Sequence, residues 1–397
     1  MKWKVEAIDM KYDFDQVIDR RNTSAYKYDR LEQFFGRADL LPLWVADMDF
    51  ATPDFILDTI RKRIEHPVLG YTRDPQDWAP SIIDWEKSHH GWEIDPDSLC
   101  FINGIMKGLG LAISRLVPEG KKVIVQPPVY HMFKYVIDGN ECEIVYNPLK
   151  EREDGLYDMD FENLEQVIDD DCRMLLLANP HNPGGVCWSK ETLAKLAEIC
   201  AKHNIIVISD EIHADMAVFG HKHIPFATVS ETAAQNSITF GAPTKVFNMP
   251  CIISAWAVVP NPELRHKYVD WLDGLELLDS NIFAMPAAIA AYRKGEEWRQ
   301  QMLAYVEDNI RFVEEYCKEN LPGIRPVRPE ASFLVWLDCR GLNLKQKDLV
   351  DLFVNKARLA FNIGTIFGEG GEGHMRLNVA TPRTVLKQAL DQLKAAM

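Results

Sequence analysis

The sequence lacks features that would point to several common roles. Lys and Arg total 44 against 59 for Asp and Glu, so the net charge is -15 and no basic excess favours nucleic acid or an anionic membrane. No run approaches about 18 uninterrupted apolar residues, the length of a membrane span. Residues 1–16 are charged throughout and lack the apolar core of a signal peptide. We therefore expect a cytoplasmic enzyme with a small-molecule substrate and with no nucleic-acid or membrane partner.

Patterns for disulfides and metal sites are also missing. Histidines cluster once, at His213, His221 and His223, without an H-E-x-x-H motif or a Cys/His grid, so a polar hairpin is favoured and no metal is predicted. The eight cysteines contain no C-x-x-C pair, which indicates reduced thiols packed in the core. They are Cys100, Cys142, Cys172, Cys187, Cys200, Cys251, Cys317 and Cys339.

The sequence does contain the pattern of an α/β protein. With 397 residues, of which 47% are hydrophobic and 26% charged, the chain can bury the cores of two domains. Residues 174–180 and 205–211 are continuous apolar runs, as expected for parallel strands buried on both faces. Residues 189–204 between them predict a helix with Ser189 as its N-cap. This alternation predicts a mostly parallel, doubly wound sheet.

The alternation ends after residue 285. A long amphipathic stretch covers residues 286–321, and two further strands are predicted at 332–338 and 374–380. Helices are expected at 344–357 and at the end of the chain. Strands and helices without the parallel repeat predict a smaller α+β domain.

Three polar groups follow strand-like segments of the first region. Asn182 lies in NPHNPGG at 179–185, Asp210 in VISDEIHAD at 207–215, and Lys245 in SITFGAPTKVFNMPC at 237–251. Successive segments are separated by roughly one strand-crossover-strand unit of about 30 residues. In an open parallel sheet such strand ends lie along one edge, where ligands bind. We therefore expect these three side chains to converge.

An amine, a carboxylate and an amide at one sheet edge suit pyridoxal 5'-phosphate. The segments NPHNPGG, SDEIHAD and APTKVFN resemble the cofactor motifs of the fold-type I, class I/II aminotransferases. The resemblance implies that Lys245 binds the cofactor aldehyde, that Asp210 keeps the ring nitrogen protonated, and that Asn182 donates to the ring oxygen. It implies three parts: an N-terminal arm with part of the small domain at 1–47, a large cofactor-binding domain at 48–285, and a small α+β domain at 286–397.

The same resemblance assigns the phosphate site. Residues 99–117 predict a short strand, a glycine turn and a helix, and a helix N-terminus offers unpaired N–H groups to phosphate. Many such turns bind nothing, so the place of this one in the family order supports the assignment. Gly104, Ile105 and Met106 are the implied cradle, and the hydroxyl of Thr244 is a further implied ligand.

Two aromatic side chains are implied neighbours of the cofactor ring. Tyr130 occupies the position of the residue that stacks on the ring, with a core tyrosine as the alternative. His213 stands where aminotransferases typically carry a tyrosine that bonds the ring oxygen; the alternative is a supporting core histidine. His131 departs from the lyase pattern, in which a second tyrosine follows, and residues 249–251 replace an expected small Ala-Gly pair.

Substrate binding and assembly are implied as well. Arg376, within HMRLNVATPR, corresponds to the arginine that binds the substrate α-carboxylate, together with Asn182. A surface salt bridge is the alternative for Arg376. Tyr71 corresponds to a tyrosine that crosses to the neighbouring subunit and bonds the cofactor phosphate, which implies a homodimer; the alternative is a loop tyrosine packed on its own domain.

Subgroup signatures favour one reaction. The arm at residues 14–24, the segment WVADMDF at 44–50 and D-E-I-H at 210–213 resemble the carbon–sulfur β-lyases related to cystathionine β-lyase and cystalysin. The resemblance implies β-elimination of cysteine S-conjugates, giving a thiol, pyruvate and ammonia. An aminotransferase, and a lyase with a second role as a regulatory binding partner, remain the alternatives.

Overall fold

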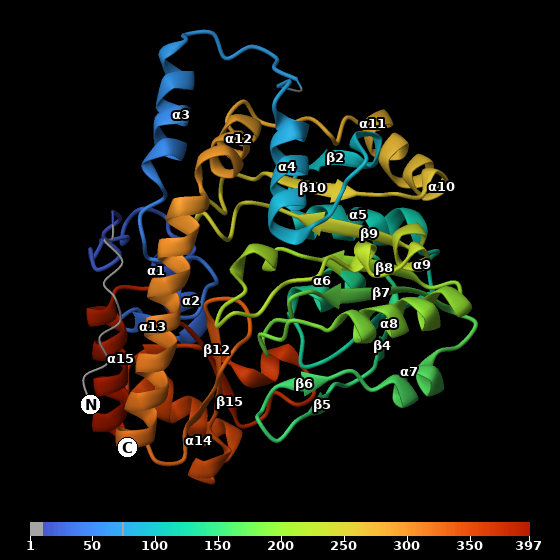
Figure 1. Cartoon of the computed structure of the whole chain (residues 1–397). Coiled ribbons are helices and arrows are strands. Elements are labelled where there is room, and N and C mark those ends of the chain that lie inside the picture. The colour runs from blue at the N-terminus through green and yellow to red at the C-terminus, as the bar shows by residue number, and fades with distance from the viewer. Residues whose placement is uncertain (1–10, 74) are drawn as a thin grey trace.

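The computed structural model describes residues 11–73 and 75–397 (Figure 1). The first ten residues of the predicted arm, and Asp74 in the loop after Tyr71, therefore lie outside the described residues. Within the described part of the chain, no helix combines the length and the apolar composition that a membrane crossing requires.

A seven-stranded sheet forms the centre of the larger part of the molecule, with strand order β2-β10-β9-β8-β7-β3-β4. Strands β3, β4, β7, β8 and β9 run parallel, whereas β10 is antiparallel to both of its neighbours. In chain order the strands are β2 (Leu99–Ile102), β3 (Lys122–Val125), β4 (Glu143–Tyr146), β7 (Cys172–Ala178), β8 (Ile206–Asp210), β9 (Ser237–Gly241) and β10 (Ala255–Val258).

Helices cover both faces of this sheet, and alternate residues of a strand separate the two cores. Met174 and Leu176 of β7 pack with helices α5 and α6, whereas Leu175 and Leu177 pack with α8 on the other face. This two-sided burial explains why β7 reads as a continuous apolar run. The helices of this part are α3 (Asp54–Glu65), α4 (Trp78–His90), α5 (Ile105–Leu116), α6 (Met132–Asp138), α7 (Phe161–Val167), α8 (Lys190–Lys202), α9 (Glu231–Gln235), α10 (Pro262–Arg265), α11 (Trp271–Gly274) and α12 (Ala284–Lys294).

The second part is built on a four-stranded antiparallel sheet with order β11-β12-β15-β14. It contains α13 (Glu296–Asn320), β11 (Arg325–Val327), β12 (Leu334–Asp338), α14 (Gln346–Asp351), β13 (Leu359–Ala360), β14 (Asn362–Ile363), β15 (His374–Asn378) and α15 (Arg383–Ala396). The N-terminal segment joins this part, because β1 (Leu41–Pro42) pairs in parallel with β13. Helices α1 (Tyr26–Asp29) and α2 (Leu31–Phe35) precede β1, and the short hairpin of β5 (Lys150–Glu151) and β6 (Tyr157–Asp158) lies in the larger part.

The long helical stretch predicted at 286–321 is two helices, α12 and α13, separated at Gly295. A Cβ atom at Gly295 would lie 2.2 Å from the ring of Phe247 and 2.3 Å from the carbonyl oxygen of Ala291. Only a residue without a side chain fits there, because the loop that carries the predicted active-site lysine packs against this break. The helix predicted at 344–357 is likewise shorter, since α14 ends at Asp351 and a π-helical turn follows at Leu352–Lys356.

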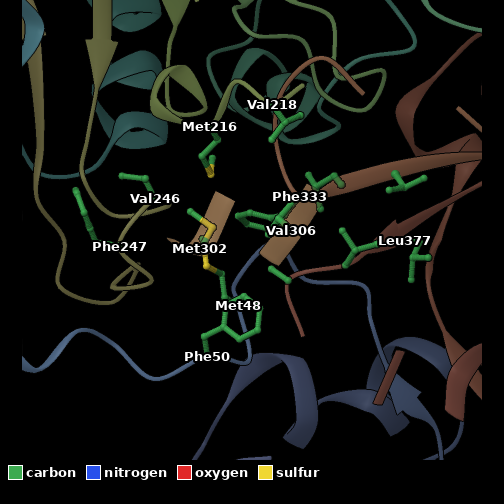
Figure 2. Close-up of a cluster of buried hydrophobic side chains, with 14 of the residues drawn as sticks. Met48, Phe50, Met216, Val218, Val246, Phe247, Met302, Val306, Phe333 and Leu377 are labelled. Atoms are coloured by element: carbon green, nitrogen blue, oxygen red, sulfur yellow. The ribbon is translucent and has the colours of Figure 1, made fainter. Parts of the chain in front are cut away.

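One apolar core joins the two parts beside this loop (Figure 2). Val246 and Phe247 of the loop belong to the same buried cluster as Met302 and Val306 of α13 and as Phe333, the residue before β12. These side chains are at most 1% exposed. The loop is therefore fixed by an apolar core that both the larger and the smaller part of the molecule contribute to.

Candidate active site

Lys245 lies four residues beyond the end of β9, in the turn anchored by Val246 and Phe247. Its Nζ donates a hydrogen bond of 2.5 Å to the backbone carbonyl oxygen of Ala46. Burial lowers the pKa of Lys245 to about 8, against the opposing effect of the Asp47 charge. An amine with a lowered pKa is neutral in a larger fraction of molecules at physiological pH than a surface lysine, and only the neutral form can act as a nucleophile or base.

Asp210 is the last residue of β8, the parallel neighbour of β9. Its carboxylate accepts a hydrogen bond of 3.2 Å from the backbone N–H of Ile212. Burial raises the pKa of Asp210 to about 6, while that N–H and the Lys245 charge act in the opposite direction. The group is therefore mainly an anion at neutral pH, and a nearby cation would hold it ionised.

The predicted residues at these strand ends line one cavity of about 310 Å³. Its walls come from the ends of β7, β8 and β9, the N-terminus of α5, and the segment before β10, as the doubly wound topology predicts. The predicted residues brought together there are Gly104, Ile105, Met106, Tyr130, Asn182, Asp210, His213, Thr244 and Lys245.

One end of the cavity has the form of an anion site. Gly104 precedes α5 with φ of 94°, a conformation that favours glycine, and a Cβ there would lie 3.3 Å from Ile253. The first N–H groups of α5 have no acceptor within the helix and so can bind a phosphate. Thr244 lines the same cavity, as does the buried Ser254, which the sequence motifs did not indicate because it stands alone before β10.

Arg376, on β15, lies in a second cavity that shares Ala46, Tyr130 and Lys245 with the first. Its side chain donates to Asn182 Oδ1 at 2.9 Å, to Asn362 Oδ1 at 2.5 Å and to the Trp44 carbonyl at 3.1 Å.

The charge of Arg376 has no acidic partner among the described residues. The residue is 3% exposed, and its Nε atom has no hydrogen-bond partner in the described part of the chain. Burial lowers the pKa of Arg376 to about 10. A buried, uncompensated guanidinium is unfavourable unless an anion binds to it, so the surface salt bridge considered from the sequence is not what the structure contains.

His213 and Tyr130 complete the cavity wall. His213 is buried, and its Nδ1 has no hydrogen-bond partner among the described residues. Burial, and then the charges of Lys245 and Arg376, lower the pKa of His213 to about 3, so its imidazole is neutral at physiological pH. Burial also raises the pKa of Tyr130, which keeps its hydroxyl protonated.

The polar hairpin predicted around the histidines is wrong. A 3-10 turn at Ala214–Met216 follows β8, and His223 is buried against Glu211, with Nε2 2.7 Å from Oε2. Glu211 also accepts hydrogen bonds from Ser209 and from the Phe226 backbone, so the strand end behind Asp210 is rigidly held.

Another acid–histidine group consists of Glu151, Asp338 and His374, whose possible ligand atoms lie within 4.8 Å of one another. Arg340 pairs with both carboxylates there, at 2.5 Å and 2.8 Å. These ion pairs account for the clustering without a metal.

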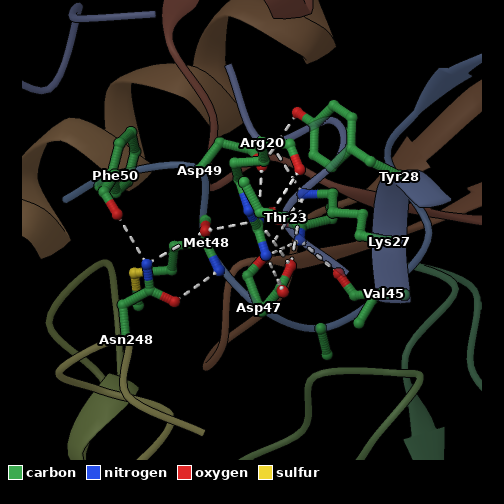
Figure 3. Close-up of polar contacts among 12 residues, drawn as sticks. Arg20, Thr23, Lys27, Tyr28, Val45, Asp47, Met48, Asp49, Phe50 and Asn248 are labelled. Carbon is green, nitrogen blue, oxygen red and sulfur yellow. Dashed lines mark hydrogen bonds and ion pairs between the residues drawn. The ribbon is translucent and has the colours of Figure 1, made fainter. Parts of the chain in front are cut away.

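The N-terminal arm holds the segment that contains Ala46 through the polar contacts drawn in Figure 3. Arg20 bonds Asp47 at 2.5 Å and Asp49 at 2.9 Å, and the fully buried Lys27 bonds Asp49 at 2.8 Å. Asn248, three residues after the lysine, bonds the backbone of Met48 and Phe50. The arm and the lysine loop thus fix each other through this segment.

Replacing Lys27 with methionine is expected to lower the free energy of unfolding by about 1.5–3 kcal/mol, because the buried Asp49 carboxylate keeps Arg20 but loses its charged hydrogen bond with Lys27. Urea denaturation followed by circular dichroism would measure the change. Lys11 is the matched control, since it forms an ion pair with Glu297 in which the two side chains are 61% and 55% exposed. Lys11→Met should lower the free energy of unfolding by at most about 1 kcal/mol. Equal losses for the two variants would contradict a structural role for the network.

Tyr71 is the one predicted site residue that does not reach either cavity. It is fully exposed, in a surface groove formed by residues 69–73 with Asp279, Ser280 and Ile282. Packing on its own domain, the alternative considered from the sequence, is therefore not observed.

The two sequence departures lie at the rims of the cavities. His131 lines the second cavity, and burial lowers its pKa to about 4. At 249–251, Met249 is buried in the core, Pro250 lines the first cavity, and Cys251 is exposed. The prediction of core thiols is wrong for Cys251, because this residue lies at the surface of the turn. Cys100 and Cys187 are only partly buried, and all eight cysteines are free.

Comparison with known proteins agrees with this arrangement. The chain is 38% identical over 385 residues to cystathionine beta-lyase PatB of Bacillus subtilis, covering 97% of this chain and 99% of that protein. Cystalysin from Treponema denticola, which contains pyridoxal 5'-phosphate, superposes with a TM-score of 0.93 at 30% identity, covering 98% and 99% of the two chains. The pyridoxal-phosphate-bound C–S lyase from Staphylococcus hominis superposes with a TM-score of 0.90 at 33% identity, covering 97% of this chain and 98% of that one. The family model for aminotransferase class I and II matches residues 39–393, and the chain therefore belongs to that family.

Proposed function

We propose that this protein binds pyridoxal 5'-phosphate and catalyses β-elimination of cysteine S-conjugates. The observation that carries the proposal is the convergence of a partly buried lysine, Lys245, a buried carboxylate, Asp210, and a buried arginine without an acidic partner among the described residues, Arg376, around two joined cavities. The names of the relatives, cystathionine beta-lyase and C–S lyase, favour elimination over transamination. In the overall reaction the C–S bond breaks, water is consumed, and thiol, pyruvate and ammonia are released.

The cavity residues fit the cofactor. The turn at Gly104 and the N-terminus of α5 would hold its phosphate, with the hydroxyl of Thr244. Lys245 would bind its aldehyde, and Asp210 would hold a proton on its ring nitrogen. The neutral His213, whose Nδ1 lacks a partner, and Asn182 are available to the ring oxygen. When bound, the cofactor supplies an electron-accepting ring that stabilises negative charge on the substrate α-carbon.

The protein's own residues account for substrate orientation and proton transfer. Arg376 would bind the α-carboxylate with its planar guanidinium, which is already oriented by Asn182 and Asn362. Lys245, with its pKa near 8, would remove the α-proton. Loss of that proton and expulsion of the thiolate from the adjacent carbon then give the elimination product.

Release of pyruvate tests the reaction type directly. The purified protein is incubated with S-methylcysteine, S-benzylcysteine or cystathionine, with and without an added keto acid, and pyruvate is measured with lactate dehydrogenase. A lyase forms pyruvate and thiol without the keto acid. Strict dependence on a keto acceptor would instead establish the aminotransferase alternative.

Replacing Arg376 with lysine is expected to lower kcat/KM for the cysteine conjugate by about 10²-fold, mainly through KM, because a bidentate charged contact of about 3 kcal/mol is lost. Initial rates over a range of substrate concentrations measure the change. Arg61→Lys is the matched control, because that side chain is 64% exposed. An unchanged KM in the Arg376 variant would exclude Arg376 as the carboxylate ligand.

We further propose that the protein acts in the cytoplasm as a homodimer in which Tyr71 reaches the partner's cofactor site. Two features support this: eight free cysteines suit a reducing compartment, and Ile64, Val68 and Leu69, close to Tyr71 in the sequence, also have exposed apolar side chains.

Mixing two inactive variants tests the shared site. Tyr71→Ala and Lys245→Ala are each expected to lose most activity, but refolding an equal mixture should restore about one quarter of it, since half of the dimers then hold one intact site. Sedimentation would establish the dimer. If Tyr71 serves its own chain, the mixture stays inactive.

A further inference from the structure

The second cavity extends well beyond Arg376. Its volume is about 580 Å³, and it is continuous with the first cavity through Ala46, Tyr130 and Lys245. A substrate whose carboxylate is bound by Arg376 and whose α-carbon lies near Lys245 has its remaining atoms in or near this space. The lining of the cavity therefore bears on which S-substituents the enzyme accepts.

One wall consists of aromatic side chains from the N-terminal segment. The rings of Tyr26, Phe34 and Trp44 form a cluster, with centroids 5.2 to 5.5 Å apart. Trp44 is fixed by a 2.9 Å hydrogen bond from its Nε1 to the Lys27 carbonyl. Tyr26 and Phe34 line this cavity and are 52% and 47% exposed, so each presents apolar area that the described part of the chain leaves uncovered.

The remaining lining is also largely apolar. Tyr135 and Ile366, which are 63% and 41% exposed, lie at the rim, and Phe361 and Ile363 line the cavity from the small domain. Binding a hydrocarbon group against this lining is favourable because apolar surface is removed from water. Binding a charged group there is not, because the group loses its hydration.

The charged groups of the lining are all positive. They are Lys134, Lys245 and Arg376, and none of the described lining residues is acidic. Lys134 lies at the surface, 59% exposed, and pairs with Asp138 outside the cavity. An ammonium group on the substrate would therefore meet like charge and find no carboxylate partner.

We propose that this cavity, which we call the thioether pocket, binds the S-substituent and selects uncharged apolar or aromatic conjugates. The inference deepens the proposed function and rests on it. It implies that cystathionine, whose substituent carries an ammonium and a carboxylate, is a poorer substrate than an S-benzyl or S-alkyl cysteine.

A substrate series measures the selection. The kcat/KM of S-benzylcysteine is expected to exceed that of S-methylcysteine by about tenfold or more, because the ring covers apolar surface of the pocket. S-Butylcysteine and S-(3-aminopropyl)cysteine have the same length and release thiols of similar acidity. The kcat/KM of S-(3-aminopropyl)cysteine, which carries the ammonium group, should be lower than that of S-butylcysteine by about tenfold or more.

Variants on both walls locate the selection in the structure. Phe34→Ala and Ile366→Ala each should lower the ratio of kcat/KM for S-benzylcysteine to that for S-methylcysteine by about fivefold. Tyr146→Ala is the matched control, because this tyrosine is 47% exposed but does not line the pocket, and its ratio should stay unchanged. Circular dichroism checks that each variant is folded. Because Phe34 and Ile366 lie on different walls, one variant still tests the pocket if the other does not fold.

The outcomes separate this inference from the proposed function. If no conjugate yields pyruvate, the proposed function fails. If every conjugate yields pyruvate at similar kcat/KM, or cystathionine exceeds S-benzylcysteine, the lyase assignment stands and the thioether pocket is overturned. Equal ratios for Phe34→Ala, Ile366→Ala and Tyr146→Ala would also overturn it.

Discussion

Replacing Lys245 with alanine is expected to lower the rate of pyruvate formation by about 10³-fold or more, because the group proposed to transfer the α-proton is removed. The proposed covalent attachment of the cofactor would be lost with it. Lys245 is well suited to both roles, since burial lowers its pKa to about 8 and the Ala46 carbonyl fixes the position of its Nζ. Initial rates and the visible absorption of the lysine-bound cofactor would both be measured.

Lys202→Ala is the matched control for this experiment. Lys202 is 62% exposed and pairs with Glu165 at the surface, so its removal should leave the rate and the spectrum unchanged. Reduction with borohydride followed by peptide mass analysis should identify the cofactor on the peptide that contains Lys245. A Lys245→Ala variant that turns over at the parent rate would refute the proposed function.

Replacing Asp210 with asparagine is expected to lower kcat by about 10³-fold, the second largest effect. At an effective dielectric constant of about 20, a carboxylate about 4 Å from a cation contributes about 4 kcal/mol, which corresponds to about three powers of ten in rate. Asparagine keeps the volume of the side chain but removes the charge that would hold a proton on the ring nitrogen. The backbone N–H of Ile212 can still bond the amide oxygen, so the strand end should keep its structure.

The Asp210→Asn variant should still bind the cofactor covalently through Lys245, with a changed visible spectrum and little turnover. Asp58→Asn is the matched control, because Asp58 is 69% exposed and its ion pair with Arg61 lies at the surface. Retention of parent kcat in the Asp210 variant would show that no charge is needed at this position. Loss of cofactor binding would instead point to a structural role for the carboxylate.

The doubly wound sheet could be predicted because its strands carry their own signal. Strand β7 is apolar at every position that faces either core, and Ser189 caps α8 through a 3.1 Å hydrogen bond from the Thr192 N–H, as the sequence indicated. The division of the chain at residues 47 and 285 remains a prediction. It agrees with the pairing of β1 with β13, which ties the N-terminal segment to the C-terminal sheet.

The break at Gly295 could not be predicted. Amphipathic periodicity runs through residues 286–320 without interruption, and only the ring of Phe247, which is 48 positions away in the sequence, shows why position 295 has no room for a side chain. The placement of His223 could not be predicted either, because its burial against Glu211 depends on a tertiary contact between a loop and the end of a strand.

By itself the sequence determined the order of the motifs, the strand ends that carry Asn182, Asp210 and Lys245, and the family to which they point. These features are local, because a strand end and the polar residues after it are defined within about ten positions. Only the tertiary structure decided that the N-terminal segment supplies both the Ala46 carbonyl beside Lys245 and the aromatic wall of the thioether pocket. The contact between Ala46 and Lys245 joins residues 199 positions apart, and contacts between such distant segments are set by tertiary packing rather than by a local sequence pattern.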